Sequence, residues 1–563
     1  MDPELANDGN WKKDSSDSTP HETVGPDDEI TWQYLTFDTE LSRPSCFTTS
    51  TPLSMNEQQP PQCPDLKPYT NPYLWSRQRK NFMTWFGCIA TTITAYTAGS
   101  YAAGNEQYMQ QWHISEPAAE VGIAIFTVGF GVAPMFLAPF SEINGRRPVF
   151  VATGALFVVF QLTCALTPTF AGMLVARFFA GCASSTFSTM VGGVISDYYH
   201  AEDRNWAMTL FTMGAIGGSG LGPLVSGFIG QNTTWRWIFR LQVCTCGLLM
   251  IFIAAFFKES RGSILLSRKA KALNKWYDEL EAAGYYGVSM PGIHPSSVVP
   301  GEKNASALPQ RIRWKVQSDE ERVSLFKMIS ISLYRPMHLL VTEPVVLFFS
   351  IWITFAWGLL YLLFSAIPLI FSTRYGFNIA ESGAVFAAVS IAAVLSAILS
   401  IYQEPLARKY VTNEKHKEFL STPEGRLLFC CVQSTLLPIG CFWFGWTCFS
   451  EIHWVVPTIG IGVATMGVFS IYLAVFNYLA DCYHKYASSA LAAQSFCRNL
   501  VGGSFPIWTA FMFRGLTYGG AGSLLGGIAA ILTVVPWILV FYGPRIRARS
   551  KIARELLVKN DSD

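Results

Sequence analysis

The chain has 563 residues, of which 14% are charged and 50% are hydrophobic, and its formal net charge is +2. Soluble domains carry about a quarter of their residues as charges, so this balance excludes a set of soluble domains and favours a chain that lies mostly in lipid. The near-neutral charge also argues against nucleic acid as a partner, because nucleic-acid binding needs a clustered basic face.

The N-terminal segment before the first apolar run is polar, acidic and rich in Pro and Ser, and it shows no signal peptide. Such a composition cannot bury enough apolar surface to fold. We therefore predict that residues 1–80 are a disordered cytoplasmic tail.

Apolar runs long enough to cross a membrane then recur along the chain. A hydrocarbon core of about 30 Å needs roughly 20 residues of helix. The runs are 82–104, 118–140, 148–168, 170–195, 207–230, 237–257, 344–371, 381–402, 427–449, 454–480, 487–512 and 520–542. They predict an all-α membrane protein with twelve transmembrane helices in two six-helix bundles. The first bundle is 81–257, the central loop is 258–338, the second bundle is 339–543 and the C-terminal tail is 544–563.

Positive charge lies in alternate connections, and cytoplasmic loops carry the excess of Lys and Arg. The residues are Arg77, Arg79, Lys80, Arg146, Arg147, Lys258, Arg261, Arg268, Lys269, Lys271, Lys275, Arg408, Lys409, Lys415, Lys417, Arg545, Arg547, Arg549 and Lys551. Both termini and the central loop are therefore predicted to be cytoplasmic.

The two halves also resemble each other. SDYYH at residues 196–200 ends the fourth predicted helix, and ADCYH at 480–484 ends the tenth. A proline follows at a similar distance in each half, Pro223 and Pro506. Parallel repeats with a site between them are typical of transporters.

The fifth predicted helix contains GGSGLGPLVSG at residues 217–227. No strand precedes these glycines and no Lys-Ser or Lys-Thr pair follows them, which excludes a phosphate loop. Gly214, Gly218 and Gly222 recur every four residues and predict a face on which a second helix packs closely. Pro223 is expected to bend the helix. Two interpretations stay open: a general packing face, or a bend that seals a cavity.

Among the polar residues inside predicted membrane helices, Arg177, Asn477 and Arg498 are our candidates for a functional role. Because a charge in lipid is costly, we expect them to face protein or water, in proton coupling or in the cavity. Arg177 has the alternative of being held by backbone carbonyls. Tyr361 and Phe364 lie one turn apart and are our candidates for binding flat organic molecules.

No acidic partner for Arg177 is apparent, since the first helix has no acid between Lys80 and Glu106. No His, Cys or acid spacing indicates a metal site, a cofactor or catalysis. Asn232 begins a glycosylation sequon in a loop too short for ready modification.

Several stretches resemble signatures of the major facilitator superfamily. Gly218, Gly222, Pro223 and Gly227 fit the antiporter signature GxxxGPxxGG, with Ser226 in place of one glycine. SEINGRRPV resembles the superfamily's loop signature, although Ala138 replaces its first glycine. RFFAGCASS around Arg177 resembles the fourth-helix signature of drug:proton antiporters. NPYLWSRQRK, WRWIFRLQ and FNYLADCYHKYASSALAAQSFCRN are similar to fungal 12-spanning members of that group.

The resemblance implies a cytoplasmic latch at the loop signature. Its members would be Glu142, Gly145, Arg146 and Asp197, while for Arg147 plain membrane anchoring is an equal alternative. Ser365 stands where several polyamine-type relatives carry a glutamate, which argues against a polycationic substrate.

The resemblance further implies a proton-coupled efflux antiporter that exports drugs, fungicides, toxins or secondary metabolites by alternating access. We expect a monomer in the plasma membrane, with the vacuolar membrane as the alternative address, and with lipid, protons and a small organic substrate as partners. The alternatives are an uptake or facilitative transporter for a nutrient or polyamine, and a membrane receptor that transports nothing.

Overall fold

The computed structural model describes residues 28–39, 41, 61–200, 203–283, 310–320, 324–410, 422–483 and 486–549. The chain divides into two compact units. One, called here the helical unit, consists of Ser76–Lys258 and Leu325–Asp563; the other, called the tail–loop unit, consists of Met1–Trp75 and Glu259–Ser324.

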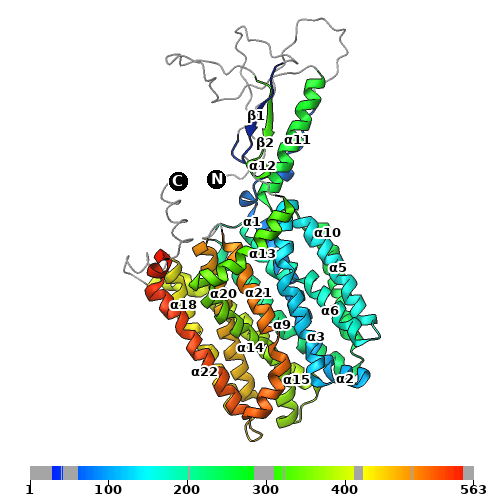
Figure 1. Cartoon of the computed structure of the whole chain (residues 1–563), viewed down its shortest axis with the longest axis vertical. Helices are drawn as coiled ribbons and strands as arrows, with labels where there is room; N and C mark the ends of the chain where they lie inside the picture. The colour runs from blue at the N-terminus through cyan, green and yellow to red at the C-terminus, as the bar shows by residue number, and fades with distance from the viewer. Residues whose placement is uncertain are drawn as a thin grey trace. The chain divides into compact units, whose positions relative to one another are not determined.

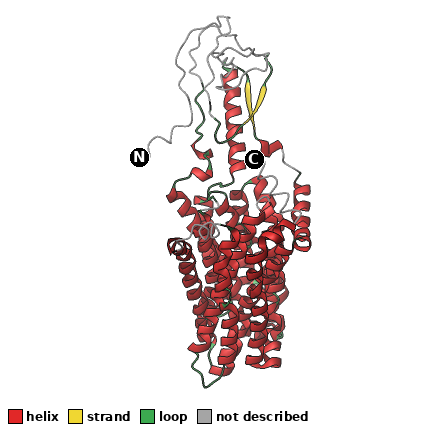
Figure 2. Cartoon of the chain, turned by 90° about the vertical axis from the view of Figure 1, so that its left-hand side faces the viewer, coloured by secondary structure: helices red, strands yellow, loops and turns green. Residues whose placement is uncertain are grey.

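The helical unit is built almost entirely of helices (Figures 1 and 2). Its first half contains α1 (Arg77–Ser100), η4 (Tyr101–Gly104), α2 (Asn105–Trp112), α3 (Glu116–Val132), α4 (Pro134–Asn144), α5 (Arg146–Leu166), α6 (Phe170–Ser184), α7 (Thr186–Thr189), α8 (Val191–Ser196), α9 (Arg204–Asn232) and α10 (Arg236–Phe256). Its second half contains α13 (Leu325–Thr342), α14 (Pro344–Tyr375), α15 (Ile379–Val385), α16 (Ala387–Tyr410), α18 (Pro423–Gln433), α19 (Leu436–Thr447), α20 (Val455–Tyr483), α21 (Ala487–Gly502) and α22 (Phe505–Arg549).

These elements follow the predicted order of twelve membrane helices. Several predicted helices are interrupted by short breaks, as between α3 and α4 at Ala133. Conversely, α22 runs from the end of the predicted helix 487–512 through the predicted helix 520–542, with a kink at Thr517, where φ is 63°. Within the described residues, ten helices are long and apolar enough to cross a membrane by composition alone. The ten do not include the first and eleventh predicted membrane helices. The first corresponds to α1, which begins with charged residues, and the eleventh begins with α21, which is only 16 residues long.

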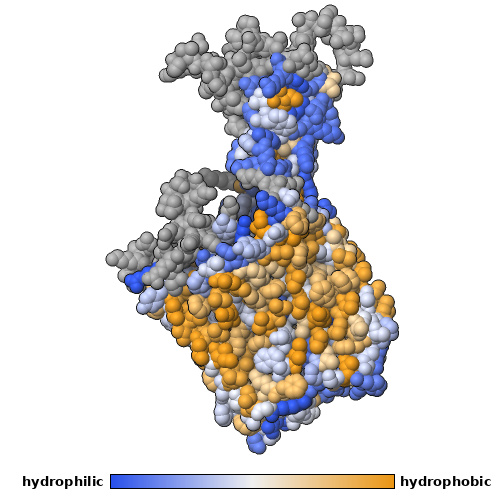
Figure 3. Space-filling view, viewed as in Figure 1, coloured by the Kyte–Doolittle hydropathy of each residue, from blue (hydrophilic) through white to orange (hydrophobic). Residues whose placement is uncertain are grey.

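The outer flank of the helical unit is apolar, while hydrophilic residues gather where α2 and the end of α14 lie (Figure 3). Large side chains such as Ile251, Phe511 and Ile531 are more than 60% exposed on the unit's surface. Exposing such a surface to water would cost free energy, and apolar patches of this extent are rare on soluble monomers. Contact with lipid tails avoids this cost. The chain is therefore a multi-pass membrane protein.

The tail–loop unit corrects the expectation that the N-terminal segment lacks structure. Strand β1 (Thr31–Tyr34) pairs in parallel with β2 (Ile312–Lys315), and Thr31 lies opposite Ile312. Turns η2 (Lys67–Tyr69) and η3 (Pro72–Leu74) follow in the tail. The prediction of disorder over 1–80 is thus wrong for the described residues 28–39, 41 and 61–80. The rest of that tail, and residues 550–563 of the C-terminal tail, lie outside the described residues.

The central loop supplies the rest of this unit through α11 (Gly262–Ala282), β2 and α12 (Gln317–Glu320). Apolar side chains from the tail and the loop share one core. Its members include Leu35, Leu41, Leu273, Trp276, Ile312 and Trp314. Burying this apolar area is what fixes the tail segment on the loop.

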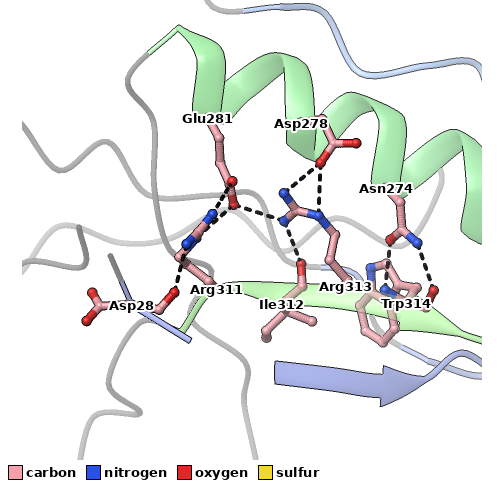
Figure 4. A network of polar contacts seen from close by, with 8 residues as sticks. All are labelled: Asp28, Asn274, Asp278, Glu281, Arg311, Ile312, Arg313 and Trp314. Atoms are coloured by element: carbon pink, nitrogen blue, oxygen red, sulfur yellow. Dashed lines mark hydrogen bonds and ion pairs between the residues drawn. The ribbon is translucent and has the colours of Figure 1, made fainter. Parts of the chain in front are cut away.

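Ion pairs clamp β2 to α11 within the tail–loop unit (Figure 4). Arg313 is 6% exposed and pairs with Asp278 at 2.7 Å and with Glu281 at 2.9 Å. Arg311 pairs with Glu281 at 2.7 Å and donates to the backbone carbonyl of Asp28. Burial opposes the charged form of Glu281, but the hydrogen bonds from the two arginines outweigh it and lower its pKa. The ion pairs thus hold β2 on α11 within the central loop, and the Arg311 hydrogen bond to Asp28 connects the loop to the tail.

Candidate functional site

The glycines of α9 lie against α1 on one face. A Cβ added to Gly218 would come within 2.5 Å of the Thr92 carbonyl oxygen, and one added to Gly222 within 2.5 Å of the Tyr96 carbonyl oxygen. A Cβ on Gly214 would come within 2.9 Å of the Cys88 carbonyl oxygen. The backbones thus approach too closely for any side chain, and the predicted packing face is confirmed.

A second glycine face of α9 meets the other half of the molecule. A Cβ on Gly220 would lie 2.9 Å from the Phe386 carbonyl oxygen, and one on Gly227 would lie 2.9 Å from the Ile379 carbonyl oxygen. The helix runs on through Pro223 to Asn232. Sequence periodicity had revealed only the first face. Helix α9 thus packs tightly against helices of both halves, and the seal stays a prediction beside the general packing face.

The loop signature forms a buried charge cluster, called the latch as above. Gly145 has φ of 98° between α4 and α5, a conformation that favours glycine. Arg146 is 4% exposed. Its Nε lies 3.3 Å from Asp197 Oδ2, and its Nη2 lies 3.7 Å from Glu142 Oε1. Arg147 instead donates to the Ala254 carbonyl oxygen near the end of α10 at 3.1 Å, and the choice between a latch role and plain membrane anchoring stays a prediction.

Asp481 holds the position in the second half that Asp197 holds in the first, but its ion-pair partner belongs to the other half. Asp481 at the end of α20 lies 3.3 Å from Arg204 Nη2 at the start of α9, and both side chains are 14% exposed. Beside this pair, Asn477 Nδ2 donates to Asn205 Oδ1 at 3.3 Å. These contacts join the two halves on the side where α1 begins, which we call the termini side.

Contacts also join the halves on the other side, which we call the opposite side. Arg514 of α22 lies 2.8 Å from Glu116 at the start of α3, with the two side chains 60% and 39% exposed. The backbone N–H of Ile379 donates to Gln231 Oε1 at 3.2 Å. Contacts between the halves are therefore present on both sides. Asn232, the sequon residue, is the exposed last residue of α9 on this side, and its glycosylation stays a prediction.

Arg177 on α6 is fully buried inside the first half. Its Nε donates to the Gly122 carbonyl oxygen at 3.1 Å and its Nη1 to the Thr97 carbonyl oxygen at 3.3 Å. Its guanidinium carbon lies 4.7 Å from the ring centre of Tyr101 and 4.4 Å from that of Phe126. Backbone carbonyls thus hold this charge, as in the structural alternative. Its Nη2 has no hydrogen-bond partner among the described residues.

Arg498 on α21 is 1% exposed and belongs to the second half. Its guanidinium carbon lies 4.5 Å from the ring centre of Trp357 and 4.9 Å from that of Tyr472. Within the part of the chain that the structure describes, its Nε and Nη1 have no hydrogen-bond partner. Such a sandwich suits a guanidinium, because its planar charge is attracted to aromatic faces.

The predicted aromatic pair lies near Arg498, which it reaches through Trp357. The rings of Tyr361 and Phe364 have centres 5.6 Å apart, and Tyr361 also contacts Trp357 edge to face at 6.1 Å. Both aromatic residues are buried in the closed molecule, at 5% and 1% exposure. The structure therefore brings together Tyr361, Phe364 and Arg498, whereas Arg177 contacts residues of the first half and Asn477 lies on the termini side.

Sequence reasoning missed one buried acid, Glu120 of α3, which is 5% exposed. Its Oε1 accepts hydrogen bonds from Ser365 Oγ of α14 at 2.8 Å and from Asn105 Nδ2 at 3.0 Å. The first of these bonds crosses from one half to the other. The signal was an acid within the apolar run 118–140, whereas the search for an acid had covered only the first helix. Among the described residues, no cluster of His, Cys, Asp and Glu could hold a metal ion.

Two helical halves that enclose buried charges, with contacts between the halves on both sides, define a membrane transporter of the alternating-access class. The family model of the Major Facilitator Superfamily matches residues 85–506. The chain therefore belongs to the major facilitator superfamily.

Among the chain's relatives is "Multidrug transporter TPO1_2" of Candida glabrata, 30% identical over 86% of this chain and 78% of that protein. Another is "Efflux pump FUB11" of Gibberella moniliformis, 30% identical over 85% of this chain and 75% of that protein. Among solved structures, the xylose transporter XylE from E. coli superposes with a TM-score of 0.53 at 13% identity, over 81% of this chain and 98% of that one. This last likeness concerns the fold alone.

Proposed function

We propose that the protein is a proton-coupled efflux transporter, an antiporter that exports small organic molecules from the cytosol by alternating access. The relatives named as multidrug transporters and efflux pumps support the direction of transport. The observation that carries the mechanism is the presence of separate contacts between the halves on both sides. The termini side is assigned to the cytoplasm because its loops carry the excess of Lys and Arg.

Alternating access follows from breaking one set of contacts at a time. Opening toward the cytoplasm separates Arg204 from Asp481, and opening toward the outside separates Arg514 from Glu116. The second glycine face of α9, at Gly220 and Gly227, packs against the other half. A substrate then reaches the centre from one side only.

The centre favours flat or amphipathic organic molecules. Trp357, Tyr361, Phe364 and Tyr472 supply rings that can stack on such a molecule and bury its area. Arg498 between two of these rings adds N–H donors.

The protein would act as a monomer in the plasma membrane.

The proton gradient can drive this export. One charge moving through 100 mV releases about 2.3 kcal/mol, enough to sustain a concentration ratio of about fiftyfold. A pH gradient adds to that ratio.

The test uses proteoliposomes with purified full-length protein and rhodamine 6G, and a verapamil and azole series as further probes. An imposed pH gradient, acid on the opposite side, should move a probe outward from the termini side. Flux without dependence on the gradient would indicate a facilitative carrier, and flux in the direction of the protons would indicate uptake. Binding with no flux of any probe would refute transport in favour of a receptor.

A further inference from the structure

Glu120 is a buried acid that joins the two halves, and nothing in the mechanism above uses it. We propose that Glu120 binds and releases the coupling proton, and that its bond to Ser365 links this step to closure of the opposite side. The coupling role of Glu120 rests on the proposed function, whereas proton binding at Glu120 can be tested without measuring transport.

The contacts of Glu120 suit a neutral acid in the closed molecule. Oε1 accepts two hydrogen bonds, from Ser365 and from Asn105. Oε2 is buried and has no partner among the described residues. A bare carboxylate enclosed in this way would be costly, because a buried charge needs a paired and fully hydrogen-bonded environment. A proton on Oε2 removes the charge and leaves both bonds to Oε1 in place.

The charged neighbours do not pair with Glu120 directly. Arg177 donates to the carbonyl oxygen of Gly122, two residues further along α3, and stacks on Tyr101. Tyr101 in turn packs on Tyr108, with ring centres 4.7 Å apart. Glu116, one turn before Glu120, is held by Arg514 of the other half. Among the described residues neither Arg177 nor Glu116 forms an ion pair or hydrogen bond with Glu120, and the charge of Glu116 opposes a second negative charge nearby.

The cross-half bond makes the site sensitive to conformation. Asn105 lies in the same half as Glu120, whereas Ser365 lies in the other. Opening the opposite side separates the halves, removes the Ser365 donor and admits water. A proton from the outside then adds to Oε2, and the neutral acid can be enclosed again. When the molecule next opens toward the cytoplasm, Glu120 gives this proton to water, so one proton crosses inward in each cycle.

Two buried acids allow a matched comparison. Glu424 of α18 is 2% exposed and accepts a hydrogen bond from Tyr478 at 3.3 Å, within the second half. Glu120→Gln and Glu424→Gln each replace a buried carboxyl by an amide of equal shape. The amide keeps the acceptor oxygen of Glu120 but cannot release a proton.

The first experiment measures proton binding by infrared difference spectroscopy of the full-length protein in lipid, titrated with pH. The wild-type protein should show a protonated carboxylic C=O band that is lost as pH rises. E120Q should lack this component and E424Q should keep it. Ser365→Ala should keep the band but change the pH at which it is lost. An unchanged titrating band in E120Q would overturn the proposal.

The second experiment measures rhodamine 6G flux in proteoliposomes. E120Q should lose the component driven by the pH gradient while exchange of dye for dye persists, which also shows that the variant is folded. Gradient-driven export by E120Q equal to wild type would overturn the coupling role. If wild-type protein shows the titrating band but moves no probe, the proposed function fails and the proton site stands.

Discussion

The ion pair between Arg204 and Asp481 gives the sharpest test of alternating access. Breaking a buried pair costs about 3 to 5 kcal/mol, and breaking an exposed pair costs about 0 to 1 kcal/mol. Both side chains are 14% exposed at a separation of 3.3 Å. An intermediate value of about 2 kcal/mol corresponds to a shift of about thirtyfold toward the state open on the termini side. We expect this shift in Asp481→Asn, which removes one charge and preserves the shape.

The shift is measurable as a distance between the halves. Asn144 at the end of α4 and Tyr410 at the end of α16 are exposed on the termini side of different halves. Spin labels at these two positions, in a variant without reactive cysteines, report opening by pulsed electron paramagnetic resonance. The ratio of the longer-distance to the shorter-distance population should rise about thirtyfold in D481N relative to wild type.

Two further variants control for the charge itself. Arg204→Asp combined with Asp481→Arg should restore the closed population. Arg514→Gln on the opposite side breaks a pair whose side chains are 60% and 39% exposed, so it should shift the closed population by less than about fivefold. A D481N population equal to wild type would refute the assignment of this pair as a gate.

Three other predictions follow from the structure. Gly222→Val should abolish folding or transport, because even its Cβ would meet a carbonyl oxygen at 2.5 Å, whereas Gly217→Ala, with 3.6 Å of room, should retain rhodamine 6G export. Arg146→Ala should lower export at normal membrane expression, and normal export would refute the role of the latch. Because the pKa of Glu281 is lowered, its contribution to the tail–loop unit is full above its ordinary pKa of 4.5 and is lost as pH falls through the lowered value. As pH falls through this range, amide hydrogen exchange in β1, corrected for the intrinsic effect of pH, should become faster. In Glu281→Gln this pH-dependent acceleration should be absent.

The helices and their close packing could be predicted from the sequence because lipid imposes a strong rule. Each span must be apolar and must satisfy its own backbone hydrogen bonds, so the runs of hydrophobic residues mark the helices directly. The spacing of Gly214, Gly218 and Gly222 marks one helix face in the same way. The pairing of Arg146 with Asp197 was available only through the resemblance, because the two residues are far apart in the sequence.

Contacts between distant segments could not be predicted. Strand β1 has only four residues, Thr31–Tyr34, and its partner β2 begins at Ile312, beyond the whole first half in the sequence. Composition alone therefore indicated disorder. Glu120 was visible as an acid in an apolar run, but its significance depends on Ser365, which belongs to the other half.

The different pairing of the repeated aspartates bears on how the two halves can be exchanged between proteins. Arg146 and Asp197 belong to the same half and would be inherited together in a chimera. Arg204 and Asp481 belong to different halves, so a substituted half would face a foreign partner. A functional hybrid therefore has to carry complementary charges at these two positions, and the duplicated halves are no longer independent modules.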